Sequence, residues 1–342
     1  MAVALVTGAT GFVGACLVPS LLARGWTVRA LTRPGAVAPA DGAEPVVVGD
    51  LADSSIPESA LVGVDVLVHL AGRAHMLRET AVDVEAAYRR VNVEATGRLA
   101  RQAAGAGVQR LVFLSSVKVN GESTDGRAIA ADRSLRAGHR GKAGIARHPA
   151  APFTEADAPA PADAYGRSKL AAEQELAAVA RTSGLEVVVI RPPLVYGPGV
   201  KANFLRLLRL VDRGVPLPFA GVDNRRSLIS VWNLCELITA CLGHPAAAGE
   251  VFLASDQRDL STPSLISLIA AAMGRPARLF AAPVSALRVA ARLFGQGAAL
   301  ERLVGSLQVD SRSASRLLGW APSVSVEEGL GRTGAWDLST RK

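Results

Sequence analysis

The first 190 residues alternate short apolar runs with longer segments of helical spacing. The runs are almost continuous in Val, Leu, Ile and Ala, which is typical of strands buried on both faces of a parallel sheet. The predicted strands are Val3–Thr7, Trp26–Thr32, Pro45–Val48, Val64–Leu70, Val108–Leu114 and Leu185–Ile190, and the clearest helices are Asp83–Ala104 and Ala164–Arg181. This alternation predicts an α/β fold with a doubly wound parallel sheet.

The regular alternation ends after Arg191, where prolines and short helices replace it. The helices predicted there are Asn203–Asp212, Thr262–Met273 and Ser285–Phe294. We therefore divide the chain into residues 1–191, which build the sheet, and residues 192–342, which form mainly a smaller α/β lobe interleaved with the sheet.

One segment of the lobe, Ala286–Leu303, is amphipathic. Leu, Val and Phe lie on one side of it, and Arg288, Arg292 and Arg302 lie on the other. A lobe helix with a solvated polar face explains this pattern, and a helix lying on a membrane surface is the alternative.

Composition excludes several classes of protein. An apolar fraction of 49% over 342 residues excludes intrinsic disorder. Three cysteines without a Cys-x-x-Cys motif exclude a disulfide scaffold and a cysteine-based zinc site, so we predict a cytoplasmic protein without a metal. No apolar segment is long enough to span a bilayer, so no membrane insertion is expected.

The net charge of +8 is concentrated in one place. Residues 127–148 contain six basic residues and one acid, a net +5 of the total. The rest of the chain is therefore close to neutral, and its 15 aromatic residues are not interleaved with basic ones. We expect no nucleic-acid partner.

A glycine-rich segment, Thr7–Gly14, joins the first strand to the first helix. Glycines at positions 8, 11 and 14 permit a tight turn and let the backbone approach a pyrophosphate at the helix N-terminus. Its place between a strand and a helix favours dinucleotide binding over an ordinary turn.

A second motif combines a tyrosine and a lysine on one helical face. Tyr165 and Lys169 are four residues apart, and an ammonium beside a phenol lowers the phenol's pKa from about 10, which suits general acid–base catalysis. Ser116 ends the fifth predicted strand, at the sheet edge where such folds place their sites.

Together with Val195–Gly199 (Val-Tyr-Gly-Pro-Gly), these motifs resemble the extended short-chain dehydrogenases/reductases, a group of nucleotide-sugar epimerases, dehydratases and reductases. The resemblance runs from Val3 to Trp320. It implies an NAD(P)-binding Rossmann-type domain over residues 1–191, a lobe that binds a UDP-sugar, and a homodimer through helices Asp83–Ala104 and Ala164–Arg181.

The resemblance also implies roles for individual residues. Ser116, Tyr165 and Lys169 would be catalytic. The implied cofactor-binding residues are Gly8, Thr10, Gly11, Phe12, Val13, Gly14, Arg33, Asp50, Leu51, Leu70, Ala71, Gly72, Asn92, Tyr165, Lys169 and Pro192, although a plain helix residue is the alternative for Asn92. The implied substrate-binding residues are Ser116, Lys118, Tyr165, Asn203 and Arg226, with a surface arginine as the alternative for Arg226.

Two further segments, Ser115–Glu122 and Gly197–Phe204, resemble bacterial enzymes that act at C4 of UDP-N-acetylhexosamines. These are 4-epimerases and the 4-ketoreductases that make 6-deoxy sugars. A 4,6-dehydratase would follow its hydroxyl residue with an Asp-Glu pair, whereas Val117 and Lys118 follow Ser116, so dehydration is disfavoured.

The end of the second strand indicates the cofactor. Thr32 stands where an NAD site carries an acid for the ribose 2′-hydroxyl, and Arg33 follows it, which favours NADP(H) over NAD(H). This choice favours an NADP(H)-dependent reduction of a UDP-4-keto-6-deoxy-N-acetylhexosamine in the synthesis of surface-polysaccharide precursors. The alternatives are a UDP-glucose or UDP-N-acetylglucosamine 4-epimerase with tightly bound NAD, and a non-catalytic NADP(H)-sensing protein.

The spacing between the catalytic residues departs from the group. Ser116 and Tyr165 are 49 residues apart, about twice the usual separation, and the excess is the basic stretch at about residues 126–150. A surface insertion explains it, and a lid or a loop that attracts the anionic substrate is the alternative.

Overall fold

Seven parallel strands form the central sheet of the computed structural model, which describes residues 1–37, 40–74, 83–127 and 151–341. The strand order is β3-β2-β1-β4-β5-β6-β9, so the direction of winding reverses between β1 and β4. The strands are β1 (Val3–Thr7), β2 (Thr27–Thr32), β3 (Glu44–Val47), β4 (Val66–His69), β5 (Arg110–Leu114), β6 (Glu186–Arg191) and β9 (Val251–Leu253). The doubly wound fold is confirmed, and its reversal point is where such sheets bind ligands.

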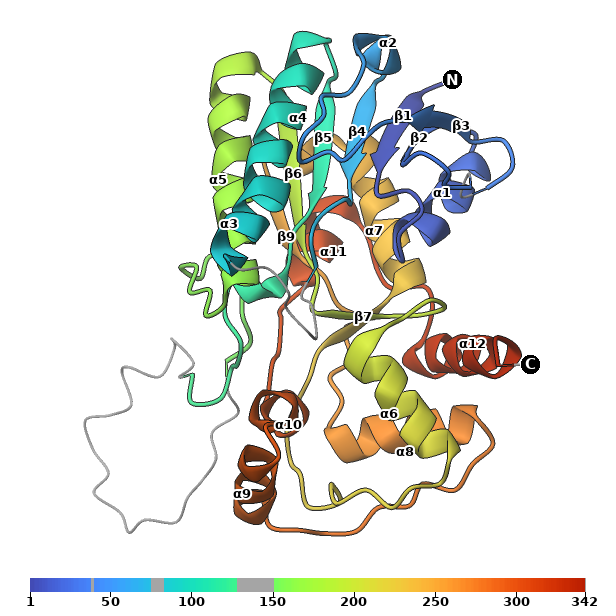
Figure 1. Ribbon diagram of the computed structural model, residues 1–342, viewed down its shortest axis with the longest axis vertical. Coiled ribbons are helices and arrows are strands. Elements are labelled where there is room, and N and C mark those ends of the chain that lie inside the picture. The colour runs from blue at the N-terminus through green and yellow to red at the C-terminus, as the bar shows by residue number, and fades with distance from the viewer. Residues whose placement is uncertain (38–39, 75–82, 128–150, 342) are drawn as a thin grey trace.

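Helices cover both faces of this sheet (Figure 1). One face packs against α1 (Gly14–Leu22), α7 (Val231–Gly243) and α11 (Arg312–Leu318). The other face packs against α2 (Glu58–Leu61), α4 (Ala95–Gly105) and α5 (Ala164–Ser183). Adjacent residues of one strand serve the two faces, since Val6 belongs to the first core and Leu5 to the second.

The predicted helix over residues 83–104 is one continuous helical run with an irregular centre. It consists of α3 (Val84–Tyr88), a π-helical turn η1 (Arg89–Glu94) and α4. A π turn inserts an extra residue per turn and is frequent at functional sites. Here it displaces the residues around Asn92 relative to an ideal helix.

The C-terminal half contributes to the sheet as well as to the lobe. Strand β9 completes the sheet beside β6, and α7 lies against its face, two elements that the hydrophobic pattern did not predict. At three residues, β9 is too short to show a strand periodicity.

The lobe has its own apolar core, built around Tyr196, Phe204 and Ile269. Its elements are β7 (Leu194–Tyr196) paired in parallel with β8 (Leu228–Ser230), and the helices α6 (Ala202–Asp212), α8 (Thr262–Ala272), α9 (Val284–Leu293), α10 (Gly297–Val304) and α12 (Val326–Ser339). The amphipathic segment Ala286–Leu303 is therefore two helices. They separate at Gly295, whose φ of 66° is left-handed and favours glycine.

Within the described ranges, no helix has both the length and the apolar character that a membrane span requires.

Candidate active site

The glycine turn between β1 and α1 has the geometry that close backbone approach requires. Gly8 has a φ of 67°, and a Cβ there would lie 2.8 Å from the backbone nitrogen of Ala71 at the end of β4. A Cβ on Gly14 would lie 2.6 Å from the carbonyl oxygen of Ala9. No described side chain caps the N-terminus of α1, and the Ala15 and Cys16 N–H groups of its first turn donate to the Gly11 and Val13 carbonyls. The helix N-terminus therefore faces the glycine turn without a competing side chain.

The neighbouring strand ends fit a dinucleotide. The Thr32 hydroxyl at the end of β2 is buried and has no hydrogen-bond partner among the described residues, and the side chain of Arg33 next to it is exposed. Asp50 lies in the turn after β3, where its carboxylate accepts a hydrogen bond from the N–H of Ala52 at 2.9 Å. The carbonyl oxygen of Leu51 accepts one from Arg98 at 2.7 Å. These features and the glycine turn fit an NAD(P) adenosine half.

Asn92 connects the loop after β4 to helix α5, which carries Tyr165 and Lys169. Its amide Nδ2 donates to the Ser168 hydroxyl at 2.9 Å and to the Arg73 carbonyl at 3.1 Å, and its Oδ1 accepts from the N–H of Arg73 at 2.7 Å. The backbone of Gly72 lies close to the Asn92 side chain, since a Cβ on Gly72 would lie 3.1 Å from the Asn92 Oδ1. Asn92 is thus a buried link between two parts of the site.

The three predicted catalytic residues come together at the carboxyl edge of the sheet. Ser116 follows β5 and caps a short 3-10 turn, η2 (Val117–Val119). Asp163 caps the N-terminus of α5 by accepting the N–H of Gly166 at 2.7 Å, which places Tyr165 in the first turn. The Ser116 side chain lies close enough to the Tyr165 phenol to lower the pKa of that phenol.

Lys169 is buried and points at the sheet. Its Nζ donates to the Leu114 carbonyl at 2.8 Å and lies 4.4 Å from the centre of the Phe113 ring. Burial lowers the pKa of Lys169 to about 8, against the opposing effect of the Glu173 carboxylate.

The expectation that Tyr165 has a lowered pKa is wrong for this state of the protein. Burial raises the pKa of Tyr165 to about 12, the neighbouring Ser116 hydroxyl offsets part of that rise, and Asp163 and Tyr88 add to it. The Lys169 ammonium does not oppose the rise because it is directed at the Leu114 carbonyl. Tyr165 is therefore a protonated phenol, the acid form, at neutral pH.

A buried ion pair beneath these residues was not predicted. Glu173 lies one turn after Lys169, and its carboxylate accepts two hydrogen bonds from Arg191, at 3.0 and 2.6 Å. The Ser115 hydroxyl also donates to Glu173, and Arg191 donates to Asn120 at 3.1 Å. The sequence held two signals of this pair. One is an arginine at the end of a buried strand, and the other is a glutamate four residues after the lysine.

Two other predicted residues have structural partners close to the catalytic group. The Lys118 ammonium is ion-paired with Glu122 at 2.7 Å and with Asp163 at 2.5 Å. The carbonyl of Pro192 accepts the N–H of Val117 at 3.0 Å, which ties the end of β6 to the turn that carries Ser116.

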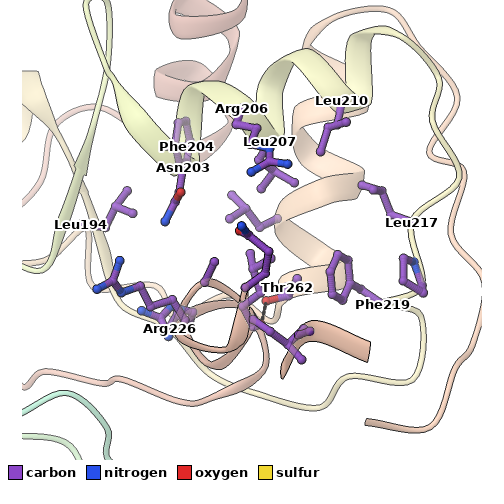
Figure 2. Close-up of a pocket in the computed structure, with 18 of the residues that line it drawn as sticks. Leu194, Asn203, Phe204, Arg206, Leu207, Leu210, Leu217, Phe219, Arg226 and Thr262 are labelled. Carbon is purple, nitrogen blue, oxygen red and sulfur yellow. Dashed lines mark hydrogen bonds between the residues drawn. The ribbon is translucent and has the colours of Figure 1, made fainter. Parts of the chain in front are cut away.

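The lobe contains a cavity of about 360 Å³, lined mainly by apolar side chains of α6, α8 and α10 (Figure 2). Asn203 on α6 and Arg226 lie on opposite sides of it. Arg226 donates one hydrogen bond to the Gly305 carbonyl at 2.9 Å, and burial lowers its pKa. An arginine held in a mostly apolar pocket suits an anionic group on an otherwise uncharged ligand.

The lobe packs directly on the glycine turn. Phe12 contacts the lobe core, and a Cβ at Gly199 would lie 3.5 Å from its ring. The cofactor cradle and the lobe are thus joined through one aromatic side chain. Residues 128–150, which make up most of the basic stretch proposed as a lid, are not among the described residues. Arg127, just before them, is ion-paired with Asp157 at 2.6 Å.

The described residues contain no group of three His, Cys, Asp or Glu side chains that could hold a metal ion.

Comparison with known protein families shows to which family this chain belongs. The family described as NAD dependent epimerase/dehydratase matches residues 4–254, well over half of the chain. The chain belongs to this family. It is therefore an enzyme that uses NAD(P), and its Ser-Tyr-Lys group lies at the sheet edge that the fold provides for catalysis.

Individual known proteins are similar to this chain over nearly its full length. A UDP-glucose 4-epimerase of Vibrio cholerae is 41% identical over 331 residues, covering 96% of this chain and 93% of that protein. A 4-hydroxy-2-methyl-3-oxo-4-farnesyl-3,4-dihydroquinoline-1-oxide ketoreductase of Stigmatella aurantiaca is 30% identical over 351 residues, covering 95% and 93%. The structure of MoeE5 with UDP-glucuronic acid and NAD has a TM-score of 0.72 and 26% identity, covering 98% of this chain and 99% of that one.

Proposed function

We propose that this enzyme interconverts the C4 epimers of a UDP-hexose, glucose or N-acetylglucosamine type, with NAD as its cofactor. The observation that carries the proposal is the 41% identity to a UDP-glucose 4-epimerase over 96% of the chain, with Ser116, Tyr165 and Lys169 in place. The proposal reverses the preference for a reductase that Thr32 and Arg33 suggested.

Each catalytic side chain has a task that its position explains. The Tyr165 phenol exchanges a proton with the oxygen at C4, and the Ser116 hydroxyl, which lies beside the phenol, stabilises charge on that oxygen. The buried Lys169 ammonium supplies a positive charge four residues from Tyr165 on the same helix. A bound nicotinamide supplies the acceptor and donor of hydride.

The glycine turn at Gly8, Gly11 and Gly14 would hold the pyrophosphate of the cofactor, with the Asp50 turn near the adenosine half. The cavity lined by Asn203 and Arg226 would hold the diphosphate and base of the sugar nucleotide. We also propose a homodimer through the exposed sides of α4 and α5, as the family resemblance implies.

A reductase of a 4-keto sugar nucleotide with NADP(H) is the second candidate, because no acid ends β2. Thr32 and the exposed Arg33 stand there, and an arginine at this position could meet a 2′-phosphate. The 30% identity to a ketoreductase over 95% of the chain also supports this reading.

One pair of measurements separates the two candidates. The purified enzyme is incubated with UDP-glucose or UDP-N-acetylglucosamine, and the C4 epimer is measured by NMR while absorbance at 340 nm is followed. The epimerase reading requires formation of the epimer without net change in the absorbance, and mass spectrometry should find NAD in the denatured protein. The epimerase reading would be wrong if the enzyme consumed NADPH with a 4-keto-6-deoxy sugar nucleotide and formed no epimer from either hexose.

Replacing Arg226 should weaken substrate binding selectively. We expect Arg226→Gln to raise KM for the UDP-sugar by about 10- to 100-fold, since a hydrogen bond to a charged group contributes about 1.5–3 kcal/mol. The adjacent Arg225 is exposed and does not line the cavity, so Arg225→Gln is the matched control. Equal effects of both variants on KM would remove Arg226 from the substrate site.

A further inference from the structure

Helix α9 presents apolar side chains to solvent as well as to the lobe. Val284, Leu287 and Ala291 pack against the lobe core. At 100° per residue, Val289 and Leu293 lie on the opposite side of the helix, and they are 59% and 80% exposed. A surface helix normally carries polar residues there.

The exposure continues beyond the helix. Phe294, which follows the last residue of α9, is 78% exposed, and no residue of α9 is buried. Large apolar side chains gathered on one outward face indicate a surface that contacts something else. Figure 1 places α9 in the lobe, at the end of the molecule opposite α2.

The same part of the chain is strongly basic. Between residues 275 and 302 there are five arginines and one acid, a net charge of +4. Together with the basic stretch at 127–148, this exceeds the +8 of the whole chain, so the remainder is slightly acidic. The positive charge of the described residues is therefore concentrated in the segment of the sequence that contains α9.

Part of this charge is locally compensated. Arg288 on α9 is paired with Glu301 at 2.8 Å, and Arg275 with Asp212 at 3.1 Å. Both arginines remain about half exposed. Arg292 adds a second positive charge on α9 itself, so the helix keeps a positive balance after the Arg288–Glu301 pair is counted.

The charge selects among the surfaces that could cover this face. A second copy of the chain would bring two basic faces together, which repel. The basic stretch 128–150 carries the same sign of charge. An anionic bilayer matches both properties, because it attracts arginines and accepts apolar side chains at the boundary between headgroups and acyl chains.

We propose that α9 docks this enzyme on an anionic lipid surface, with Val289, Leu293 and Phe294 entering the interface and the arginines contacting headgroups. None of the described helices crosses the bilayer in this arrangement. Ala291 of the same helix lines the substrate cavity, so the cavity would lie just behind the docked face.

Co-sedimentation with lipid vesicles tests the proposal. The full-length protein is mixed with vesicles of phosphatidylcholine alone or with 30 mol% phosphatidylglycerol, at ~0.1 M salt. We expect at least about tenfold stronger binding to the anionic vesicles. The double substitution Leu293→Ser and Phe294→Ser should reduce that binding by at least about tenfold, because it removes most of the apolar surface.

The control is Val62→Ser, which removes a similarly exposed apolar side chain near α2, at the opposite end of the molecule. It should bind vesicles like the unchanged protein. Turnover of a soluble UDP-sugar should be the same in all three proteins, which shows that they are folded.

Three outcomes would overturn the proposal. One is no binding to anionic vesicles, and another is binding that the double substitution leaves unchanged. The third is a dimer in analytical ultracentrifugation that the double substitution converts to monomers, because α9 would then be a contact between copies.

Discussion

Replacing Tyr165 with phenylalanine should reduce kcat by about 10²- to 10⁴-fold, the usual contribution of general acid–base catalysis. The phenol lies beside Ser116, which follows the carboxyl end of β5, and the serine influences the pKa of this phenol. Removing only the hydroxyl keeps the ring and its edge-on contact with Tyr88, whose ring centre lies 6.0 Å away. The loss should therefore be in chemistry, with the cofactor still bound at the glycine turn.

Tyr88→Phe is the matched control. The Tyr88 hydroxyl donates to the Ala74 carbonyl at 3.2 Å, so its removal costs one neutral hydrogen bond, about 0.5–1.5 kcal/mol of stability, and leaves the proton-exchanging group in place. Steady-state kinetics and the amount of co-purified nucleotide are measured for both variants. Undiminished kcat in Tyr165→Phe would remove this residue from catalysis.

The sheet and the glycine turn were predictable from the sequence because local patterns determine them. Strand Val3–Thr7 was predicted with its observed bounds, and Gly8 and Gly14 stand where any larger side chain would meet backbone atoms. The Tyr165–Lys169 pair was predictable for the same reason, since four-residue spacing on a helix fixes which side chains share a face.

The pKa values and ion pairs of the site were not predictable, because they depend on parts of the chain that are distant in sequence. The pKa of Tyr165 is set by its burial and by the direction of the Lys169 ammonium, which points to a carbonyl at the end of β5. The partner of Glu173 comes from β6. Likewise, only the tertiary structure shows which side of α9 faces solvent.

The buried pair of Glu173 and Arg191 should be the most sensitive position for stability. The two side chains are 8% and 6% exposed, and two hydrogen bonds join them. Glu173→Gln keeps the shape of the side chain but leaves a buried guanidinium without its counter-charge, which costs about 3–5 kcal/mol. We expect a lower denaturant midpoint with an unchanged m-value.

Glu175→Gln on the same helix is the control for stability. Its carboxylate lies 3.5 Å from Arg101, and both side chains are about half exposed, so the change should stay within about 1 kcal/mol. A loss of similar size in both variants would mean that burial of the Glu173–Arg191 pair is not what stabilises this region.

The pH dependence distinguishes a positioning role of Glu173 from a purely structural one. The carboxylate raises the pKa of Lys169, which burial holds near 8, so Glu173→Gln should lower that pKa further. If the ammonium is the active form, the alkaline limb of kcat/KM should then begin at lower pH in Glu173→Gln and stay in place in Glu175→Gln.

The pH dependence of the folding stability should also shift to lower pH in Glu173→Gln. A lysine whose folded pKa is near 8, below its unfolded value of 10.5, destabilises the fold while it is charged, and stability rises as pH increases between these two values. With the folded pKa lowered by Glu173→Gln, that rise should begin below pH 8. An unshifted pH–rate profile together with a large loss of stability would reduce Glu173 to a structural counter-ion of Arg191.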